Sequence, residues 1–389
     1  MFLHSIEYSQ FENTPQEWKL SKSTFGNINL IVGMNTAGKS FSLNIINGLS
    51  NLVSGDKSVI ATSGNYDVLF SNENQKIEYI LKYEHGVVLK EILCIDSNPI
   101  NPLLERGPDG MGKIYYEKEK KILEFQTPQN ELASVNRRDS LQHSFLEELY
   151  NWGKSVRLYY FGTQLGKEVL AVLVKRNQHQ ENEPAILNLK DTNQVVAIFR
   201  KAQKEFPKSF NKLVIDDMKS IGYYLTEIGI APLESLVIRG NIPGEIMGLY
   251  VQEKDLKGKT DQINMSQGMF RALSLIVQIT YSQLADVPSC ILIDDIGEGL
   301  DYERSSALVK LLVNKAKNTK VQLIMSTNDR FIMNNVPLEY WSVIYRKGGT
   351  STIYNYQNSK ELFDSFQLTG LNNFDFFSSD YLLKELAKK

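Results

Sequence analysis

The sequence predicts an α/β protein built around a mixed sheet. Apolar and polar residues alternate through residues 1–32 and again in short pieces between 65 and 126, which is the period of β-strands. From residue 266 onward, helical segments alternate with two continuously apolar strands, 290–295 and 321–327. Such strands are typical of a parallel sheet that is covered on both faces. An antiparallel region should therefore adjoin a parallel one.

The composition narrows the class of protein. Of the 389 residues, 42% are hydrophobic and 23% are charged, which fits one large or two medium globular domains. The net charge of −2 gives no overall attraction to nucleic acid or to an anionic membrane, although a local basic patch is compatible with it. The two cysteines, Cys94 and Cys290, and the four histidines lack the spacing of a zinc site. No signal peptide and no membrane-spanning run is evident, so we expect a cytoplasmic protein.

Helical and strand patterns alternate in the middle of the chain. Helical spacing is evident over residues 38–50 and again over 139–152, where an Asp or a Ser could cap the helix. The remaining predictions, in chain order, are a strand over 155–162, a polar loop over 177–184, helices over 192–230 and strands over 234–255.

Residues 31–50, IVGMNTAGKSFSLNIINGLS, contain a candidate phosphate-binding loop. GMNTAGKS has the pattern G-x-x-x-x-G-K-S, and it lies between the strand INLIV and a helix, which is the context that supports the motif. The glycines let the backbone curl so that its N–H groups point at phosphate oxygens, and the helix N-terminus adds a partial positive charge. Lys39 would reach the β- and γ-phosphates, and Ser40 would bind Mg²⁺. The predicted nucleotide-binding residues here are Gly33, Asn35, Thr36, Ala37, Gly38, Lys39, Ser40 and Phe41.

An acidic pair follows the first of the apolar strands. In CILIDDIGEGLD, residues 290–301, Asp294 ends the strand and Asp295 comes next. Asp294 would hold Mg²⁺ through water, and Asp295 would polarise an attacking water molecule. A strand that ends in an acidic turn is common, so the functional interpretation depends on the phosphate-binding loop that accompanies it.

Two further segments are ambiguous by themselves. NMSQGMFRALSL, residues 264–275, places Ser266, Gln267 and Gly268 at a helix start, which is either an anion site or an ordinary helix cap. LIMSTNDRF, residues 323–331, is a buried strand that ends in polar residues. Asn328 in this segment either contacts the γ-phosphate or the attacking water, or belongs to a capped turn.

In this order, the motifs resemble those of the ABC-type ATPase head that SMC proteins, the RecF repair protein and OLD-type nuclease ATPases share. GMNTAGKS resembles Walker A, ILIDD resembles Walker B, and MSQGMFRAL resembles the ABC signature in its RecF-like spelling. GLD, residues 299–301, falls on the D-loop, and STND falls on the switch segment. The motifs cover residues 26–50 and 262–336.

The resemblance implies a P-loop NTPase fold of the ABC/SMC-head type, with a mixed sheet core and an antiparallel β subdomain. The interval between Ser40 and Ser266 is too long for a transporter domain and too short for an SMC arm, so we expect a compact α/β lid. The predicted division is residues 1–165 for the N-terminal part of the head, 166–255 for the lid and 256–389 for the C-terminal part of the head.

The resemblance also implies ATP and Mg²⁺ as cofactors and a nucleotide-sandwich dimer in which Ser266 binds the γ-phosphate held by the other copy. Asp295 stands where the family usually has Glu, so we expect slow hydrolysis because a misplaced base costs rate. Asn328 replaces a histidine and can only form hydrogen bonds. Glu298 either compensates for Asp295 or is a solvated loop acid. Gln142 is our choice for the glutamine of the metal site, although we favour the interpretation that it is an exposed polar residue at a helix start.

The resemblance to short bacterial ATPases suggests a role in anti-phage defence beside a separate effector, either a nuclease or a toxin. Self-association as a dimer or a higher multiple is expected, without a membrane partner. A RecF-like repair ATPase that binds DNA is the alternative, and a transporter motor is disfavoured by the missing histidine and the large insert. The aromatic residues near the C-terminus either pack onto the head, which we favour, or dock a partner. They are Phe366, Phe374, Phe376, Phe377 and Tyr381.

Overall fold

The computed structural model describes residues 1–58, 63–72, 75–96, 98, 100–173, 188–233, 245–317 and 319–387. The predicted loop over 177–184 and the first part of the strand region predicted over 234–255 lie outside these residues. The chain forms two compact units. Unit 1 comprises Met1–Val156, Gln322–Asn328 and Val336–Lys389, and unit 2 comprises Arg157–Val321 and Asp329–Asn335.

A short parallel group of strands forms one part of the unit 1 sheet. Strand β3 (Ile28–Val32) lies between β16 (Val321–Thr327) and β17 (Trp341–Lys347) and is parallel to both. All five residues of β3 are buried, which explains its continuous apolar sequence. The parallel pairing that the sequence predicts is confirmed for the strand over 321–327.

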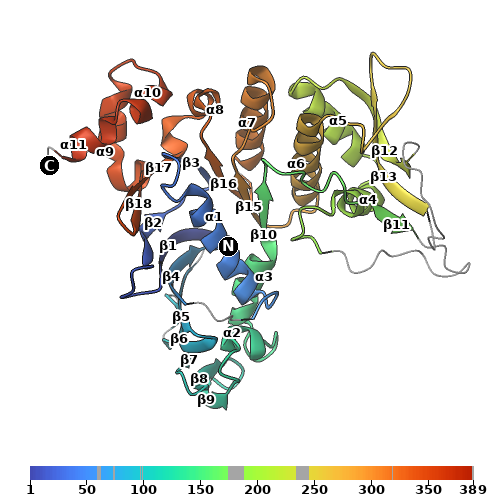
Figure 1. Cartoon of the computed structure of the whole chain (residues 1–389). Helices are drawn as coiled ribbons and strands as arrows, with labels where there is room; N and C mark the ends of the chain where they lie inside the picture. Colours follow the sequence, from blue (N-terminus) through green and yellow to red (C-terminus); the bar gives the residue numbers. More distant parts are fainter. Residues whose placement is uncertain are drawn as a thin grey trace, which may run out of the picture. The chain divides into compact units, whose positions relative to one another are not determined.

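The rest of the unit 1 sheet is largely antiparallel. Strand β17 turns back into β18 (Thr350–Asn355), which lies beside β2 (Trp18–Thr24), and β2 pairs with β1 (Phe2–Gln10). An antiparallel meander follows from β1, in the lower part of Figure 1. Its strands are β4 (Gly64–Ser71), β5 (Lys76–Glu84), β6 (Val87–Ile95), β7 (Leu104–Arg106), β8 (Met111–Tyr116) and β9 (Lys121–Gln126). This confirms the antiparallel region predicted between residues 65 and 126.

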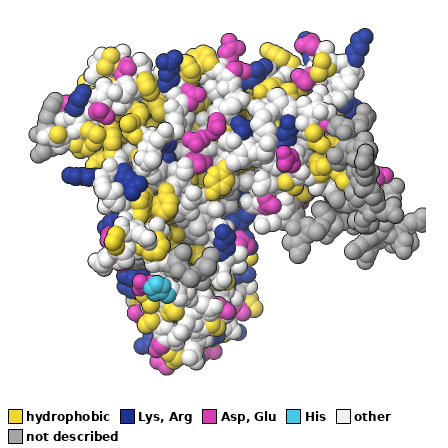
Figure 2. Space-filling view, in the orientation of Figure 1, with side chains coloured by type: hydrophobic (Ala, Val, Ile, Leu, Met, Phe, Trp, Pro, Cys, Tyr) yellow, Lys and Arg dark blue, Asp and Glu magenta, His cyan; other side chains and the backbone are white. Residues whose placement is uncertain are grey.

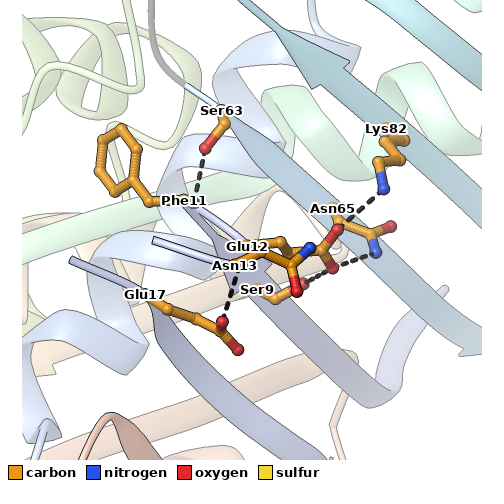
Figure 3. A network of polar contacts seen from close by, with 8 residues as sticks. All are labelled: Ser9, Phe11, Glu12, Asn13, Glu17, Ser63, Asn65 and Lys82. Atoms are coloured by element: carbon orange, nitrogen blue, oxygen red, sulfur yellow. Dashed lines mark hydrogen bonds and ion pairs between the residues drawn. The ribbon is translucent and has the colours of Figure 1, made fainter. Parts of the chain in front are cut away.

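A polar network closes the end of β1 (Figure 3). The carboxylate of Glu12 accepts hydrogen bonds from the Ser9 hydroxyl at 2.7 Å, the Asn65 amide at 3.1 Å and the Lys82 ammonium at 2.8 Å. These bonds, with that from Lys82 the strongest, lower the pKa of Glu12 to about 2. The network therefore ties the turn after β1 to the neighbouring strands β4 and β5.

Helix α1 (Lys39–Val53) buries Leu43, Ile46 and Leu49, as its helical spacing predicts. Helix α3 (Phe145–Ser155) packs against α1, and a short α2 (Ala133–Asn136) precedes it. The predicted helix over 139–152 begins later than expected. The Asp139 carboxylate accepts the N–H groups of residues 141 and 142, which holds this segment in a turn instead of a helix.

The C-terminal aromatic residues pack within unit 1. They come from α9 (Tyr356–Gln367), α10 (Asn373–Ser378) and α11 (Tyr381–Leu386), which follow a 3₁₀ turn η1 (Leu338–Tyr340). Phe376 is fully buried, and its ring centroid lies 4.9 Å from that of Phe366 and 6.3 Å from that of Trp341. The favoured prediction that these aromatics pack onto the head is confirmed for Phe366 and Phe376.

Unit 2 is built around α6 (Gln267–Leu284), in which every residue from Gly268 to Ser282 is buried. Helices α4 (Val195–Glu205) and α5 (Phe210–Ser220) pack on it (Figure 1). Strand β10 (Val156–Tyr160) neighbours β15 (Ser289–Asp294), and α7 (Tyr302–Ala316) packs with α8 (Arg330–Asn335). A small antiparallel sheet contains β11 (Ala171–Leu173), β12 (Leu225–Pro232), β13 (Glu245–Glu253) and β14 (Thr260–Asp261).

The helical prediction over residues 192–230 is wrong at its C-terminal end. Helix α5 ends at Ser220, and Gly222 has a φ of +86°, a left-handed conformation that commonly terminates helices. The following residues form strand β12, which pairs with β13. Among the described residues, no helix is both long and apolar enough to cross a membrane.

Candidate functional site

The phosphate-binding loop of unit 1 has the tight, strained backbone that its glycines suggest. Thr36 has a φ of +67° and Gly38 a φ of +109°. The left-handed region is unfavourable for a β-branched residue such as Thr36, so the loop holds this conformation at an energetic cost. Gly33 has no room for a side chain, because a Cβ there would lie 2.7 Å from the carbonyl oxygen of Ile344. Strand β17 therefore requires a glycine at the start of the loop.

The side chains of the loop divide into a buried lysine and exposed polar groups. Lys39 is 6% exposed, and its Nζ donates to the carbonyls of Gly33 at 2.9 Å and Met34 at 3.2 Å. The ammonium is thus folded across the loop itself. The side chains of Asn35, Thr36 and Ser40 are exposed.

Residues far away in the sequence brace the loop, and sequence reasoning did not find them. The Ser351 hydroxyl of β18 donates to the Ala37 carbonyl at 2.8 Å. The Trp18 ring of β2 packs edge-on against Phe41, with ring centroids 4.2 Å apart. Phe41, predicted to belong to the nucleotide-binding set, thus also anchors the start of α1 to the sheet.

Asn328 lies next to this loop. Strands β16 and β3 are parallel, with Thr327 opposite Val32. The next residue of each strand is Asn328 and Gly33, so both lie at the same edge of the sheet. The structure therefore brings Asn328 and the phosphate-binding loop together, as their predicted roles require.

The structure places Gln142 beside the turn between β8 and β9. Its N–H donates to Asp139, and its carbonyl accepts the N–H of Glu117 in the turn between β8 and β9. The α3 helix that follows meets α1 through Gly153, where a Cβ would lie 2.9 Å from the Ser50 carbonyl oxygen. These contacts do not join Gln142 to the phosphate-binding loop, and its role as a ligand of Mg²⁺ stays a prediction.

In unit 2, three acidic residues gather near the ends of β10 and β15. Asp294 ends β15, is 8% exposed, and its carbonyl accepts the N–H of Phe161 at 3.0 Å. Asp295 turns away with a φ of +54°, a conformation that Asp tolerates better than most residues. The Glu298 carboxylate lies over Gly162, because a Cβ there would be 2.2 Å from its Oε2. Glu298 is exposed, and it lies close to the acidic pair because its N–H donates to the Asp295 carbonyl at 3.3 Å.

The loop after β10 contains a polar residue that sequence reasoning missed. Gln164 is exposed and lies two residues beyond Gly162, the residue that Glu298 covers. Gln164 lies four residues after the end of β10, whereas Asp294 ends β15 and Asn328 directly follows β16. A polar residue shortly after a buried strand was the available signal. Gln164 is a stronger candidate than Gln142 for the glutamine of the site.

The start of α6 holds the three predicted signature residues. The Ser266 hydroxyl caps the helix by accepting the Met269 N–H at 3.2 Å. Gln267 turns its amide to the Thr163 carbonyl at 3.1 Å. A Cβ at Gly268 would lie 2.9 Å from the carbonyl oxygen of Gly299, so the signature and D-loop segments are in close backbone contact.

Arg271 joins three segments of unit 2. Its guanidinium donates to the carbonyls of Gly162 at 2.7 Å, Thr163 at 2.8 Å and Glu298 at 2.8 Å, and the residue is 9% exposed. Burial lowers the pKa of Arg271, and the negative charge of Glu298 partly offsets this effect. Arg271 thus fixes the loop after β10 and the D-loop segment to the signature helix.

The predicted metal ligands are hard oxygen donors. Ser40 lies in unit 1 and Asp294 in unit 2, and a hydroxyl and a carboxylate both suit Mg²⁺. Within the described residues there is no group of three or more His, Cys, Asp or Glu side chains that could hold a metal ion. Mg²⁺ usually takes only one or two protein ligands, and nucleotide phosphates and water complete its coordination.

Comparison with solved structures shows that the chain is similar in fold to the head domains of SMC proteins. An SMC head bound to the C-winged helix domain of ScpA is 14% identical, covers 91% of this chain and 98% of its own, and has a TM-score of 0.52. The SMC head domain from Thermotoga maritima is 14% identical over 91% of this chain and 99% of its own, with a TM-score of 0.44. A Pyrococcus furiosus Smc head with an extended coiled coil, bound to the C-terminal domain of ScpA, is 12% identical over 94% and 99%, with a TM-score of 0.47.

Comparison with protein-family models gave no match, and neither did comparison with curated proteins. The fold is therefore assigned from structure alone. It is that of an SMC head, a mixed α/β fold of the P-loop type with a large mixed sheet and a separate small antiparallel sheet. The fold class predicted from the sequence is confirmed.

Proposed function

We propose that the protein is an ATPase of the ABC/SMC type that binds ATP with Mg²⁺ and hydrolyses it slowly. The observation that carries this proposal is the phosphate-binding loop. A strand, a strained loop and a helix follow one another, and the buried Lys39 is folded onto the loop at the point where phosphates would lie. The SMC-head fold supports the same class.

In this proposal each site residue has a separate role. Lys39 and the loop N–H groups bind the phosphates, and Ser40 and Asp294 bind Mg²⁺. Asp295 polarises the attacking water, with Glu298 as a second acid nearby. Asn328 hydrogen-bonds the γ-phosphate or the water. Bound Mg²⁺ would supply charge neutralisation on the phosphates.

Two copies form a nucleotide sandwich in which Ser266, Gln267 and Gly268 of one copy meet the ATP held by the other. The exposed start of α6 supports this arrangement, because a helix N-terminus attracts anions. ATP then holds the copies together and hydrolysis releases them. Higher multiples of this dimer are compatible with the same contacts.

The solution mass of Asp295→Asn protein, measured by light scattering with Mg-ATP and with Mg-ADP, tests the proposal. We expect a dimer or a larger assembly with ATP alone. Lys39→Ala should abolish ATP binding, whereas Ser266→Ala should keep ATP binding and lose the association. A monomer with either nucleotide would refute the sandwich. The same mass with both nucleotides would also refute ATP-dependent association and would indicate a permanent complex.

We further propose that the ATP state switches a separate effector protein, a nuclease or a toxin, in anti-phage defence. The resemblance of the motifs to short bacterial ATPases supports this role. Plating of phage on cells that carry the native gene with its neighbours tests it, with Lys39→Ala as the matched inactive variant. Equal plaque numbers with and without the intact gene would contradict the defence role.

A RecF-like role on DNA is the alternative. On the face shown in Figure 2, the described basic and acidic side chains are interspersed, and no extended basic strip is visible among them. This face therefore gives no support to the DNA-binding alternative. DNA affinity that falls steeply with salt would support the alternative, because contacts to phosphates release counterions.

A further inference from the structure

The peptide group between Ala37 and Gly38 is held by a side chain from a distant strand. Ser351 of β18 lies opposite Arg346 of β17 and Leu20 of β2, so neighbouring strands fix its backbone on both sides. Its side chain is fully buried, and its hydroxyl donates to the Ala37 carbonyl at 2.8 Å. The two residues are separated by 314 positions in the chain, so this hydrogen bond exists only in the folded protein.

The absence of a side chain at Gly38 makes room for this hydroxyl. A Cβ at Gly38 would lie 2.9 Å from Oγ of Ser351 and 3.1 Å from the ring of Trp18. Ala37 and Trp18 are themselves buried, with exposures of 5% and 8%. A hydrogen bond in such surroundings is strong, and the carbonyl that loses it pays the cost of an unpaired buried group.

The carbonyls and N–H groups on either side of this peptide are held within the loop and the helix. The Ala37 N–H donates to the Met34 carbonyl at 3.2 Å. The Gly38 carbonyl accepts the N–H of Ser42 at 2.8 Å and the hydroxyl of Ser42 at 2.9 Å. These contacts are local to the motif and the first turn of α1. The Ala37 carbonyl, in contrast, takes its direction from another strand of the sheet.

The planarity of the peptide group gives the Ser351 contact a chemical meaning. In a trans peptide the C=O and the N–H point in opposite directions, so a fixed Ala37 carbonyl also fixes the direction of the Gly38 N–H, away from β18. Gly38 is left-handed, with φ +109° and ψ +14°, and Lys39 begins the right-handed α1. Successive residues of opposite hand turn their N–H groups toward a common point and form a nest that binds anions.

We propose that Ser351 is a positioning residue for phosphate binding, because its hydrogen bond to the Ala37 carbonyl keeps the Gly38 N–H aimed at a phosphate oxygen of the nucleotide. This inference rests on the proposed binding of ATP. Without the hydroxyl, the buried carbonyl lacks this partner, and rotation of the peptide toward another donor relieves the cost. The same rotation turns the Gly38 N–H away from the phosphate.

Ser342 of β17 provides a matched control. It is 1% exposed, and its hydroxyl has no hydrogen-bond partner among the residues that the structure describes. It lies opposite Ile31 of β3 and Asn355 of β18. Ser342→Ala therefore removes an equally buried hydroxyl from the neighbouring strand without removing a bond to the phosphate-binding loop.

The first experiment compares the affinities of the wild-type, Ser351→Ala and Ser342→Ala proteins for Mg-ADP by isothermal titration calorimetry. Mg-ADP is the probe because it carries phosphates for the loop and is not the substrate of hydrolysis. Ser351→Ala should weaken binding about 3- to 10-fold, the effect of one hydrogen bond. Ser342→Ala should match the wild type.

The second experiment observes the peptide itself by NMR spectroscopy. Ala37–Gly38 is the only Ala-Gly step in the sequence, so alanine labelled with ¹³C at the carbonyl and glycine labelled with ¹⁵N select this one peptide group. In the wild type and in Ser342→Ala, the Gly38 amide proton should move downfield when Mg-ADP binds, because a hydrogen bond to phosphate deshields it. In Ser351→Ala this movement should be smaller, and the Ala37 carbonyl resonance should differ from the wild type before nucleotide is added.

Three results would overturn the positioning role. The first is equal affinity of the Ser351→Ala and Ser342→Ala proteins. The second is weaker binding by Ser351→Ala with a wild-type response of the Gly38 amide. The third is weaker binding with shifts of glycine amides throughout the chain, which would show a structural role. If Ser351→Ala does not fold, Ser351→Cys replaces it, because the thiol is a weaker donor. Its affinity should fall below that of Ser342→Ala, and equal affinity would overturn the inference.

The two proposals can fail separately. If the wild type binds neither Mg-ADP nor Mg-ATP, the proposed nucleotide binding fails and this inference fails with it. If the wild type binds and Lys39→Ala abolishes binding, whereas Ser351→Ala leaves it unchanged, only the inference is overturned.

Discussion

Replacement of Arg271 should loosen two loops of unit 2 while leaving the rest of the chain intact. Arg271 donates three hydrogen bonds of 2.7–2.8 Å to the carbonyls of Gly162, Thr163 and Glu298. A hydrogen bond that involves a charged group typically contributes about 1.5–3 kcal/mol. The loss of three such bonds sets an upper bound of roughly 5–9 kcal/mol on the destabilisation of the loop contacts, before any compensation by water.

Two effects reduce this bound. Thr163 and Glu298 are exposed residues, so water can replace part of the lost bonding. Burial of the guanidinium also has a cost, as the lowered pKa of Arg271 indicates. We therefore expect Arg271→Gln to destabilise the loop contacts by about 2–3 kcal/mol, and Arg271→Lys, which can keep one or two of the bonds, by about 1–2 kcal/mol.

Hydrogen–deuterium exchange measures this directly. With Arg271→Gln, amide exchange in residues 161–166 and 297–300 should accelerate by a factor on the order of 30–150, the equivalent of about 2–3 kcal/mol. Exchange in β5 and β6 of unit 1 should not change. Lys310→Gln, at an exposed position of α7, is the control and should match the wild type in all segments.

Two outcomes would refute this reasoning. Unchanged exchange in both loops would mean that the three hydrogen bonds contribute nothing net. Uniformly faster exchange throughout unit 2 would mean that Arg271 supports the whole unit instead of the two loops.

Two further predictions follow from single contacts. Gly162→Ala would place a Cβ 2.2 Å from Oε2 of Glu298, so this exposed carboxylate must swing away, at a cost below about 1 kcal/mol. If Glu298 assists hydrolysis, the rate of ATP hydrolysis should fall in both the Gly162→Ala and the Glu298→Gln protein. An unchanged rate in the Glu298→Gln protein would show that Glu298 takes no part in the mechanism. Glu12, with its pKa lowered from 4.5 to about 2 chiefly by Lys82, contributes stability that is complete above pH 4.5 and is lost as the pH falls toward 2. The contribution should be below about 1 kcal/mol because the group is partly exposed. Glu12→Gln should therefore slightly reduce the fall in melting temperature between pH 5 and pH 3. An unchanged fall would contradict the assignment.

The sequence was most informative where the chemistry is local. The phosphate-binding loop needs a strand, two glycines, a lysine and a helix start, and all of them lie within residues 28–53. A period-two pattern also predicted strands in the segments that form β4, β5, β6, β8 and β9. In contrast, the helical prediction over 192–230 continued past Gly222, because a single glycine does not reveal that the next residues will find a strand partner in β13.

The choice of a glutamine for the candidate site shows the same limit of prediction from sequence. Gln142 and Gln164 both lie near predicted elements, and spacing alone does not distinguish them. Only the folded chain shows that Gln142 joins the turn between β8 and β9, whereas Gln164 follows β10, the strand beside Asp294.

The sequence by itself therefore determined the fold class and the position of the phosphate-binding loop, because periodicity and loop chemistry depend on residues that are close together in the chain. The tertiary structure alone decided that Arg271 fastens residues 162, 163 and 298, and that Trp18 supports Phe41. These contacts join residues that are far apart in the chain. Each depends on how strands and helices pack, a property that no short stretch of sequence contains.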